Sequence, residues 1–323
     1  MRVLVTGAAG FLGRWLVERL AREGHSVRGL VRKTPTPELA PSKNIEFLEG
    51  DVTQPTSLAR AVEGTEVVFH LAGIRRGATR APFFEVNALG TRNVLEAMVA
   101  ARCRRFVLCG SLAAMGPSTR ERPHLESDPL LPTEWYGESK AEAERIAWEY
   151  GDRLELTVVR PPRILGPGDR ENLVFFKMVK KGVKLSLSGG PRPLSMVDVG
   201  DVVDFLLLLA THAGAVGEAF FVSSFTTSLE EIEGLAALYL GVKPRLLQLS
   251  PLGLRMLAAA ADGVSRATGH NLPLSRKLAR QLLAPAWTCS TTKAEQRLGF
   301  FSRHTLEASI ARSARWYLDE GWL

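Results

Sequence analysis

The chain has 323 residues, 46% of them hydrophobic and 23% charged, and its 41 Lys and Arg exceed its 34 Asp and Glu to give a net charge of +7. The length is typical of about two domains. The proportions are typical of a globular protein and argue against disorder, collagen and coiled coil. The basic excess is spread along the chain rather than gathered into a tail, so the sequence does not favour nucleic-acid binding.

The cysteines and the apolar runs indicate the compartment. Cys103, Cys109 and Cys289 stand in no metal-ligand spacing, which predicts neither a metal site nor a disulfide framework and favours a reducing environment. The first apolar run begins directly after Met1 and Arg2, and the longest run, residues 205–210, is too short to span a bilayer. We therefore expect a cytoplasmic protein without stable membrane insertion.

The first half of the chain alternates short β-branched runs with helical patterns. The strands are expected at residues 2–6, 27–31, 45–48, 67–70, 106–109 and 155–159, and the helices at residues 11–23, 83–101 and 136–150. Strand and helix in alternation form βαβ units. The sequence therefore predicts an α/β fold of the Rossmann type, with a doubly wound parallel sheet.

From about residue 161 the alternation breaks. Residues 161–168 are rich in Pro and Gly and are expected to form a loop, after which helical patterns dominate, with brief strands near residues 184–187 and 219–222. We expect a dinucleotide-binding domain and a smaller, mostly helical C-terminal substrate lobe. Their expected extents are residues 1–165, to which segments near 195–225 return, and residues 166–323.

The strongest local signal is the turn between the first strand and the first helix, Thr6-Gly7-Ala8-Ala9-Gly10-Phe11-Leu12-Gly13. Gly7 permits a tight turn, Gly10 lets the backbone approach a pyrophosphate, and Gly13 lets the helix pack closely on the strand. The helix begins at Phe11 and Leu12, and its N-terminus offers partial positive charge to phosphates. The pattern predicts a dinucleotide site rather than an ordinary Gly-rich turn.

The second strand ends without the acidic residue that accepts hydrogen bonds from the ribose hydroxyls of NAD. Val31 stands in its place, and Arg32 and Lys33 follow. Two cations there would pair with a 2′-phosphate, which favours NADP, with NAD as the alternative. The simpler interpretation is that the two cations only solvate a loop.

Tyr136 and Lys140 open a predicted helix four residues apart and therefore lie on one face. An ammonium beside a phenol favours the phenolate and lowers its pKa from ~10, so the pair is suited to exchanging a proton with a carbonyl or hydroxyl while hydride moves to or from a nicotinamide. Alone, this spacing fits a surface pair. Downstream of a dinucleotide turn, it indicates catalysis.

These motifs stand in an order that resembles the extended short-chain dehydrogenase/reductase superfamily, the NAD-dependent epimerase/dehydratase group, over nearly the whole length. Two further matches concern the cofactor: Asp51-Val52 resembles the family's adenine-contacting pair, and His70-Leu71-Ala72-Gly73 resembles the segment beneath the cofactor. Asn87 resembles a structural asparagine of the family, and Ser111 resembles its catalytic hydroxyl. The loop that flanks the nicotinamide is matched by Arg160-Pro161-Pro162 together with Leu165-Gly166-Pro167-Gly168.

The resemblance implies a role for each catalytic residue. Ser111 would polarise the substrate oxygen, Tyr136 would be the general acid or base, and Lys140 would hold the nicotinamide ribose and depress the pKa of Tyr136. Pro162 would fill space against the nicotinamide. The simpler interpretations are that Ser111 ends a strand and that Pro162 shapes a loop.

Three arginines near this expected site have open roles. Arg163 follows Pro162 directly and either points toward the substrate or pairs with Asp169 or Glu171. Arg75 and Arg76 follow the segment beneath the cofactor. They are expected in a solvated loop, with the cofactor phosphates or the pocket entrance as the alternatives.

The choice of reaction depends on three features. An NADP-type strand end suits a reductase. Sugar-nucleotide members of the family carry an Arg where this chain has Leu194, with Arg192 displaced by two positions. Residues 246–262 are apolar, which suits the cap of a hydrophobic pocket, a contact with a membrane surface, ordinary core or a dimer contact. The apolar elements and the tail from Trp287 to Phe300 most resemble the 3β-hydroxysteroid dehydrogenase and dihydroflavonol reductase branches.

We therefore expect an NADP-dependent ketone reductase or secondary-alcohol dehydrogenase acting on a hydrophobic small molecule, such as a steroid-like, flavonoid-like or secondary-metabolite ketone. The alternatives are a nucleotide-sugar epimerase or dehydratase with bound NAD, and a non-catalytic NADP-sensing protein, against which the intact Ser111, Tyr136 and Lys140 argue. The resemblance also implies a homodimer through the helices 83–101 and 136–150.

Overall fold

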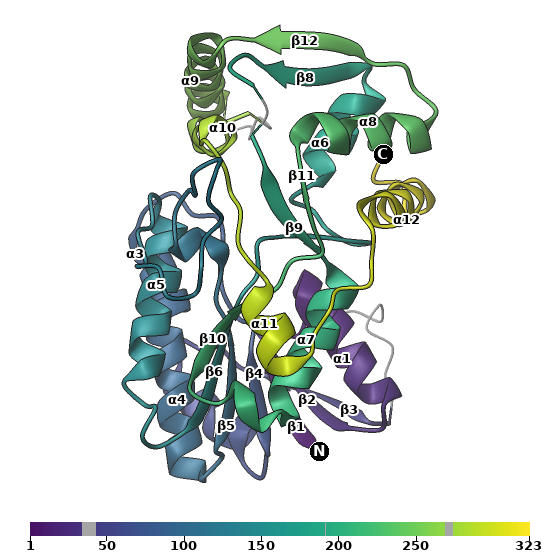
Figure 1. Ribbon diagram of the computed structural model, residues 1–323. Coiled ribbons are helices and arrows are strands. Elements are labelled where there is room, and N and C mark those ends of the chain that lie inside the picture. The colour runs from purple at the N-terminus through teal and green to yellow at the C-terminus, as the bar shows by residue number, and fades with distance from the viewer. Residues whose placement is uncertain (34–42, 191, 269–273) are drawn as a thin grey trace.

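The computed structural model describes residues 1–33, 43–190, 192–268 and 274–323. A larger body built on a parallel sheet carries the N-terminus, and a smaller lobe lies at the opposite end (Figure 1). In the described part of the chain, no helix combines the length and the apolar character needed to cross a membrane.

The larger body is a seven-stranded sheet in the order β10-β6-β5-β4-β1-β2-β3, with every neighbouring pair parallel. Its strands are β1 (Arg2–Thr6), β2 (Ser26–Val31), β3 (Ile45–Glu49), β4 (Val67–His70), β5 (Arg105–Cys109), β6 (Glu155–Arg160) and β10 (Glu218–Phe221). The chain runs outward from β1 to β3 and then returns to β4 on the other side of β1. This reversal opens a crevice at the carboxyl ends of the strands. The predicted Rossmann-type fold is confirmed.

Helices cover both faces of this sheet. On one face lie α1 (Phe11–Arg22) and α7 (Val199–Thr211), and on the other lie α2 (Ala59–Val62), α4 (Gly90–Ala101) and α5 (Trp135–Trp148) (Figure 1). The predicted apolar face of α1 points inward: Leu16 and Leu20 are fully buried, and Phe11 and Trp15 pack at the edge of the same cluster. Each face of the sheet therefore has its own apolar core.

The long helix predicted over residues 83–101 is interrupted. It consists of α3 (Ala81–Phe84), a π-helical turn η2 (Glu85–Leu89) and α4, in direct succession. π-Helical turns insert one residue into a helix and occur frequently at functional sites. The turn contains Asn87, a residue of the predicted site.

The smaller lobe combines helices with two small sheets, of which the sequence predicted only one strand. The helices are α6 (Leu173–Lys180), α8 (Leu229–Leu240), α9 (Pro251–Thr268), α10 (Arg276–Leu283) and α12 (Leu306–Asp319). One sheet has the order β11-β9-β7, from Phe225–Thr227, Leu194–Asp198 and Arg163–Leu165, and the other pairs β12 (Arg245–Leu249) with β8 (Val183–Leu187).

The brief strand expected near residues 184–187 is confirmed as β8, and the one near 219–222 is β10 of the large sheet. The loop expected over residues 161–168 is partly wrong, because residues 163–165 form β7 by pairing with β9. The remaining elements are the 3₁₀ turns η1 (Pro55–Ser57), η3 (Leu112–Ala114) and η4 (Ala213–Ala215), and helix α11 (Thr292–Leu298).

A buried carboxylate links the two bodies. Asp198 ends β9, is fully buried and caps α7 through Gly200 N. Arg312 Nη2 of α12 donates to both of its oxygens, at 2.7 and 2.6 Å, and Ser309 Oγ donates to Oδ2 at 2.6 Å. These charge-assisted bonds fix α12 against the segment that returns to the large sheet.

Candidate active site

The predicted site residues converge on one edge of the large sheet. Each group follows the carboxyl end of a different strand: Gly7 follows β1, Arg32 and Lys33 follow β2, Asp51 and Val52 follow β3, Leu71 to Gly73 follow β4, Ser111 follows β5 and Pro162 follows β6. The carboxyl ends of parallel strands lie at the same edge, next to the topological reversal between β1 and β4. Residues far apart in the sequence therefore border one crevice.

The glycine turn is packed so closely at Gly7 and Gly13 that neither position has room for a side chain. Gly7 has a φ of +70°, and a Cβ there would lie 2.8 Å from Ala72 N. A Cβ at Gly13 would lie 2.2 Å from Gly7 O. The turn is thereby packed between α1 and the segment after β4.

The N-terminus of α1 is free to meet an anion. Gly10 is exposed and occupies the N-cap position, and no side chain caps the helix there. The first N–H groups of α1, from Phe11 and Leu12 on, lack a side-chain acceptor, and the helix dipole adds partial positive charge. A pyrophosphate fits this chemistry, so the residues present suit a dinucleotide cofactor.

The loop after β7 borders the same crevice from the other lobe. The Phe11 ring lies 3.7 Å from the positions that a Cβ would take at Gly166 and at Gly168. Trp15 Nε1 donates to Pro167 O at 3.1 Å. Helix α1 therefore holds the Gly166–Pro167–Gly168 loop next to the glycine turn.

Asn87 ties the segment after β4 to α5. Its Oδ1 accepts from Ile74 N at 2.7 Å, and its Nδ2 donates to Ile74 O at 3.0 Å and to Ser139 Oγ at 2.8 Å. Asn87 is fully buried. All three bonds are satisfied inside the protein, which is the behaviour of a structural residue that positions the helix carrying Tyr136.

A buried histidine fixes the same segment from beneath. His70 Nδ1 is 2.8 Å from Thr6 Oγ1, and His70 Nε2 is 3.0 Å from Thr91 Oγ1. Burial, aided by the nearby charge of Lys140, lowers the pKa of His70 to about 3. The ring is therefore neutral and acts as a scaffold between β1, β4 and α4 rather than as a proton carrier.

Ser111, Tyr136 and Lys140 come together. Ser111 starts η3, where its Oγ accepts from Ala113 N at 3.1 Å, and its side chain is hydrogen-bonded to that of Tyr136. Lys140 is 5% exposed and lies one helical turn after Tyr136 in α5. A hydroxyl, a phenol and an amine thus gather where β5 and α5 meet the crevice.

The charges around Tyr136 differ from the expectation. Burial raises the pKa of Tyr136, while Arg75 and the hydrogen bond from Ser111 act in the opposite direction. Burial also lowers the pKa of Lys140, opposed by Cys109 and Glu144. The predicted depression of the Tyr136 pKa by Lys140 is therefore not found in the protein alone, since the cation that acts most on Tyr136 is Arg75.

Arg75, for which the sequence favoured a solvated loop and left the pocket entrance as an alternative, lies next to Tyr136. Arg75 is exposed in the loop after β4, and its guanidinium carbon lies 5.5 Å from the centroid of the Tyr136 ring, so this loop borders the site. Its neighbour Arg76 pairs with Glu171 at 3.0 Å. The spacing of Arg75 behind Leu71-Ala72-Gly73 was the available signal, because that segment leads along the crevice.

Arg163 and Glu134 complete the polar border. Arg163 Nη1 donates to Asn172 Oδ1 at 3.2 Å, so its hydrogen-bond partner is neither Asp169 nor Glu171, and its guanidinium carbon lies 5.6 Å from the Phe175 ring. Glu134 precedes α5 and accepts from Gln281 Nε2 of α10 at 3.1 Å. The smaller lobe therefore reaches the site through α10.

The remaining predicted cofactor residues occupy the edge of β2 and β3. Arg32 and Lys33 are exposed. Asp51 Oδ1 accepts from Thr53 N and Thr53 Oγ1, both at 2.9 Å, and Val52 is buried beneath Gly90. Pro162 is half-buried between β6 and β7.

Across the described residues, no three His, Cys, Asp or Glu side chains are grouped to hold a metal ion.

Comparisons with known proteins agree with this geometry. The model of the NAD dependent epimerase/dehydratase family matches residues 3–223. A ceramide reductase of Caulobacter vibrioides is 33% identical over 99% of this chain and 96% of its own length. A 3 beta-hydroxysteroid dehydrogenase/Delta 5-->4-isomerase of Mycobacterium tuberculosis is 28% identical over 98% of this chain and 90% of its own.

A solved structure shares the fold over the whole chain. The dTDP-glucose 4,6-dehydratase DesIV of Streptomyces venezuelae, with NAD and TYD bound, superposes with a TM-score of 0.81 at 23% identity and covers 100% of this chain and 98% of its own.

Proposed function

Because the chain belongs to the NAD-dependent epimerase/dehydratase family and is an NAD(P)-dependent oxidoreductase of the extended short-chain dehydrogenase/reductase type, we propose that it is an NADP-dependent ketone reductase or secondary-alcohol dehydrogenase for a hydrophobic small molecule. The observation that carries this proposal is the hydrogen-bonded Ser111 and Tyr136, with Lys140 one turn away, at the edge that holds the glycine turn. The names of the ceramide reductase and hydroxysteroid dehydrogenase relatives support a hydrophobic substrate.

In this proposal, the proton and the substrate oxygen are handled by the chain's own residues. The nicotinamide, when bound, supplies or accepts hydride at its C4. In reduction, Ser111 Oγ donates a hydrogen bond to the carbonyl oxygen and Tyr136 Oη gives that oxygen a proton as hydride reaches the carbonyl carbon. In oxidation, Tyr136 takes the proton back. Lys140 would hold the nicotinamide ribose, and Arg75 supplies the positive charge beside the phenol.

The cofactor would lie across the carboxyl edge. Gly7, Gly10 and Gly13, with the N–H groups of Phe11 and Leu12, would hold the pyrophosphate; Asp51 and Val52 the adenine; Leu71, Ala72 and Gly73 the middle of the cofactor; and Pro162 the nicotinamide. Arg32 and Lys33 would pair with the 2′-phosphate. In this division, residues 1–165 and 195–225 hold the cofactor and residues 166–323 supply most of the substrate lobe.

The polar border of the site narrows the substrate. Arg75 lies above the Tyr136 ring, and Arg163, close enough to Arg75 for their charges to interact, lies beside Phe175. A guanidinium favours ligands with an oxygen acceptor. We expect a substrate with an apolar body and a hydroxyl, amide or carboxylate oxygen close to the reacting carbonyl.

The proton-transfer role is tested by Tyr136→Phe. We expect turnover of NADPH with a lipophilic ketone to fall by roughly 10²- to 10⁴-fold, which is the usual contribution of a positioned general acid to the rate. The Kd for NADPH should change little. Tyr239→Phe, at an exposed tyrosine of α8, is the matched control and keeps full turnover. Equal turnover by the wild type and Tyr136→Phe would refute the role.

The cofactor preference is tested by Arg32→Ala. Loss of an exposed charge-assisted bond to the 2′-phosphate should weaken NADPH binding by about tenfold, in keeping with ~1.5 kcal/mol for a hydrogen bond to a charged group, and leave NADH binding unchanged. Arg22→Ala, at an exposed arginine near the end of α1, is the control. Equal losses for the two cofactors reject the pairing.

A nucleotide-sugar epimerase or dehydratase is the second candidate, favoured by the shared fold with a dTDP-glucose dehydratase. Against it, Arg192 already donates to Ser188 O at 3.1 Å and to Gly190 O at 3.2 Å, and Leu194 begins β9. Release of tightly held NAD on denaturation, together with turnover of UDP- or dTDP-sugars, would replace the reductase proposal. Binding of NADPH without turnover of any ketone would instead indicate a sensor.

Assembly and compartment are also part of the proposal. We propose a homodimer through α4 and α5, which lie side by side on one face of the sheet and are joined by the Arg92–Glu149 ion pair at 3.1 Å (Figure 1). The exposed Leu89 and Trp135 near these helices support it, and light scattering after size-exclusion chromatography tests it. The three free thiols support a reducing, cytoplasmic compartment.

A further inference from the structure

Helix α9 is apolar on the side that faces water. Leu254 and Ala258 are buried against the lobe, whereas Leu252 and Met256, on the opposite side of the helix, are 66% and 65% exposed. A surface helix normally carries polar residues on its outer side. The large apolar side chains exposed on α9 and on the preceding strand β12 are Leu246, Leu247, Leu252, Met256, Leu257 and Val264. We call this set the β12–α9 face.

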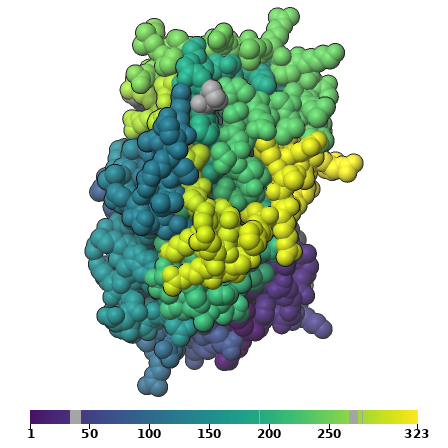
Figure 2. Space-filling view, in the orientation of Figure 1, coloured from purple at the N-terminus to yellow at the C-terminus, as the bar shows by residue number. Residues whose placement is uncertain are grey.

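The β12–α9 face forms the end of the molecule farthest from the sheet. Strand β12 is the outer strand of the two-stranded sheet and leads directly into α9 (Figure 1). In the space-filling view, the green segments that include β12 form the end opposite the purple N-terminal part (Figure 2). An apolar surface there is free to meet a large, flat partner without covering the crevice between α1 and α5.

The fold gathers positive charge around this face. Residues 173–193 contain five Lys or Arg and no Asp or Glu. Residues 241–283 contain seven Lys or Arg and one Asp. The two segments together carry a net charge of +11, whereas the net charge of the whole chain is +7. Of these cations, Lys180, Lys181, Lys243, Arg245 and Arg255 are exposed and have no ion-pair partner within the described residues. The acidic residues of the adjoining helix α8, Glu230, Glu231 and Glu233, leave the excess at +8.

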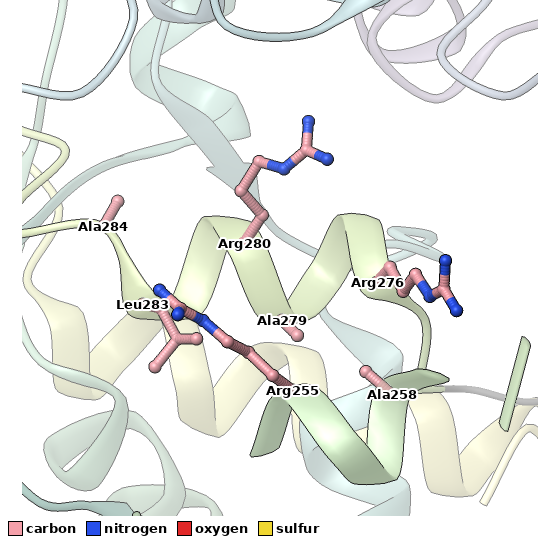
Figure 3. Close-up of a pocket in the computed structure, with 7 residues that line it drawn as sticks. All are labelled: Arg255, Ala258, Arg276, Ala279, Arg280, Leu283 and Ala284. Carbon is pink, nitrogen blue, oxygen red and sulfur yellow. The ribbon is translucent and has the colours of Figure 1, made fainter. Parts of the chain in front are cut away.

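A cavity with three arginines opens beside the face. It has a volume of about 530 Å³ and lies between α9 and α10, where Ala258, Ala279 and Leu283 supply an apolar lining and Arg255, Arg276 and Arg280 supply cations (Figure 3). Arg276 pairs with Asp262, Nε to Oδ2 at 3.7 Å. In the described structure, no carboxylate pairs with Arg255 or Arg280, so the cavity can take an anionic group.

The charge selects among the occupants of this surface. In a symmetric pair of copies, the same patch meets itself, so the cations of each would be brought against those of the other. That contact carries a repulsive cost, whereas an anionic bilayer offers both an apolar interior and opposite charge. An apolar centre with a basic surround is the composition of an interfacial membrane anchor.

We propose that the β12–α9 face docks on the surface of an anionic lipid bilayer, with Leu252 and Met256 inserted among the acyl chains and a lipid headgroup phosphate in the arginine cavity. Docking requires no catalysis and is measured without substrate. That it brings a lipid-soluble substrate to the site rests on the proposed function, and a loss of either leaves the other measurable.

The test is flotation of the full-length protein with vesicles of phosphatidylcholine alone or with a third of phosphatidylglycerol. We expect binding to the anionic vesicles, at least tenfold weaker binding to the neutral ones, and a further loss on raising the salt from 0.1 to 0.5 M. The variant Leu252→Ser/Met256→Ser should bind anionic vesicles at least tenfold less. Its matched control is Leu131→Ser/Phe301→Ser, at side chains that are 66% and 65% exposed elsewhere.

Arg255→Glu/Arg280→Glu tests the cavity and should abolish the preference for anionic vesicles while NADPH binding is kept. Free glycerol phosphate would compete with the vesicles for the protein only if the cavity recognised the headgroup alone. We expect no such competition at 1 mM glycerol phosphate. No binding of the wild type to anionic vesicles, or equal binding by the Leu252→Ser/Met256→Ser variant and its control, would overturn the proposal. A wild-type oligomer that this variant dissociates would assign the face to a second copy.

Discussion

The sheet body and the C-terminal lobe treat charge in opposite ways. In the sheet body, Arg160 and Glu144 are both buried and form an ion pair, Nε to Oε2 at 3.0 Å. In the lobe, Lys243, Arg245 and Arg255 are exposed without carboxylate partners among the described residues. The buried carboxylate of Glu233 has the Leu185 N–H as its partner, at 2.7 Å. The sheet body is thus arranged to hold residues in place, whereas the surface of the lobe is arranged to meet something else.

The largest expected effect tests whether the sheet body depends on its internal pairing. Arg160→Met leaves Glu144 buried without its cation, so we expect a loss of roughly 3–5 kcal/mol in the free energy of unfolding. Arg160→Met/Glu144→Leu should recover most of that loss, since no buried charge remains. Urea titration followed by circular dichroism measures both. If the single variant lost less than the double, the pairing would not be the reason for the stability of this body.

The same contrast explains what the sequence could predict. Gly7, Ser111 and Pro162 each follow a buried strand, and strands that alternate with helices are legible from hydrophobic pattern alone. Once the strands are parallel, these residues must share an edge, so the site follows from the strand ends. The role of Gly7 follows from the spacing of the glycines, whereas the roles of Ser111 and Pro162 follow from the resemblance to a family.

The lobe could not be predicted in this way. Strands β7 and β9 are short, and they form because they pair with each other across about thirty residues of sequence. A local sequence pattern does not predict such a pairing. The place of Arg75 stayed open for a similar reason, since its contact with Tyr136 depends on how two segments far apart in the chain meet. The gathering of charge around β12 and α9 likewise depends on folding, because it brings together two basic segments, residues 173–193 and 241–283, that are far apart in the chain.

Two helical glycines, one in each body, sharpen the comparison. A Cβ at Gly13 of α1 would lie 2.2 Å from Gly7 O, whereas a Cβ at Gly263 of α9 would meet nothing within 4 Å. Gly13→Ala must displace backbone, so we expect a loss of about 1–3 kcal/mol or more and loss of NADPH binding. Gly263→Ala should stabilise by ~0.5–1 kcal/mol, because alanine is the better helix former. Thermal unfolding with and without NADPH measures both; a stabilising Gly13→Ala would contradict the packing described for the turn.

A further test concerns Glu233, the buried carboxylate of the lobe. Burial raises its pKa to about 7, while the Leu185 N–H and Lys184 act in the opposite direction. An acid with a pKa raised in the folded state binds its proton more tightly there than in the unfolded chain, where the pKa is ~4.3. Its contribution to stability therefore falls as the pH rises from about 4.5 to 7, and the folded protein holds a buried charge above pH 7.

Glu233→Gln removes this charge and keeps the shape, so we expect the variant to be more stable than the wild type by up to ~3.5 kcal/mol at pH 8, because burial raises the pKa from 4.5 to about 7 and one pKa unit corresponds to ~1.4 kcal/mol. The slope of stability between pH 4.5 and 7 should flatten in the same variant, while Glu121→Gln, at an exposed loop position, keeps the wild-type slope. Urea titrations at pH 5, 6, 7 and 8 give this comparison. If Glu233→Gln and the wild type kept parallel profiles, Glu233 would be charged throughout, and the lobe would hold a buried charge as readily as the sheet body does.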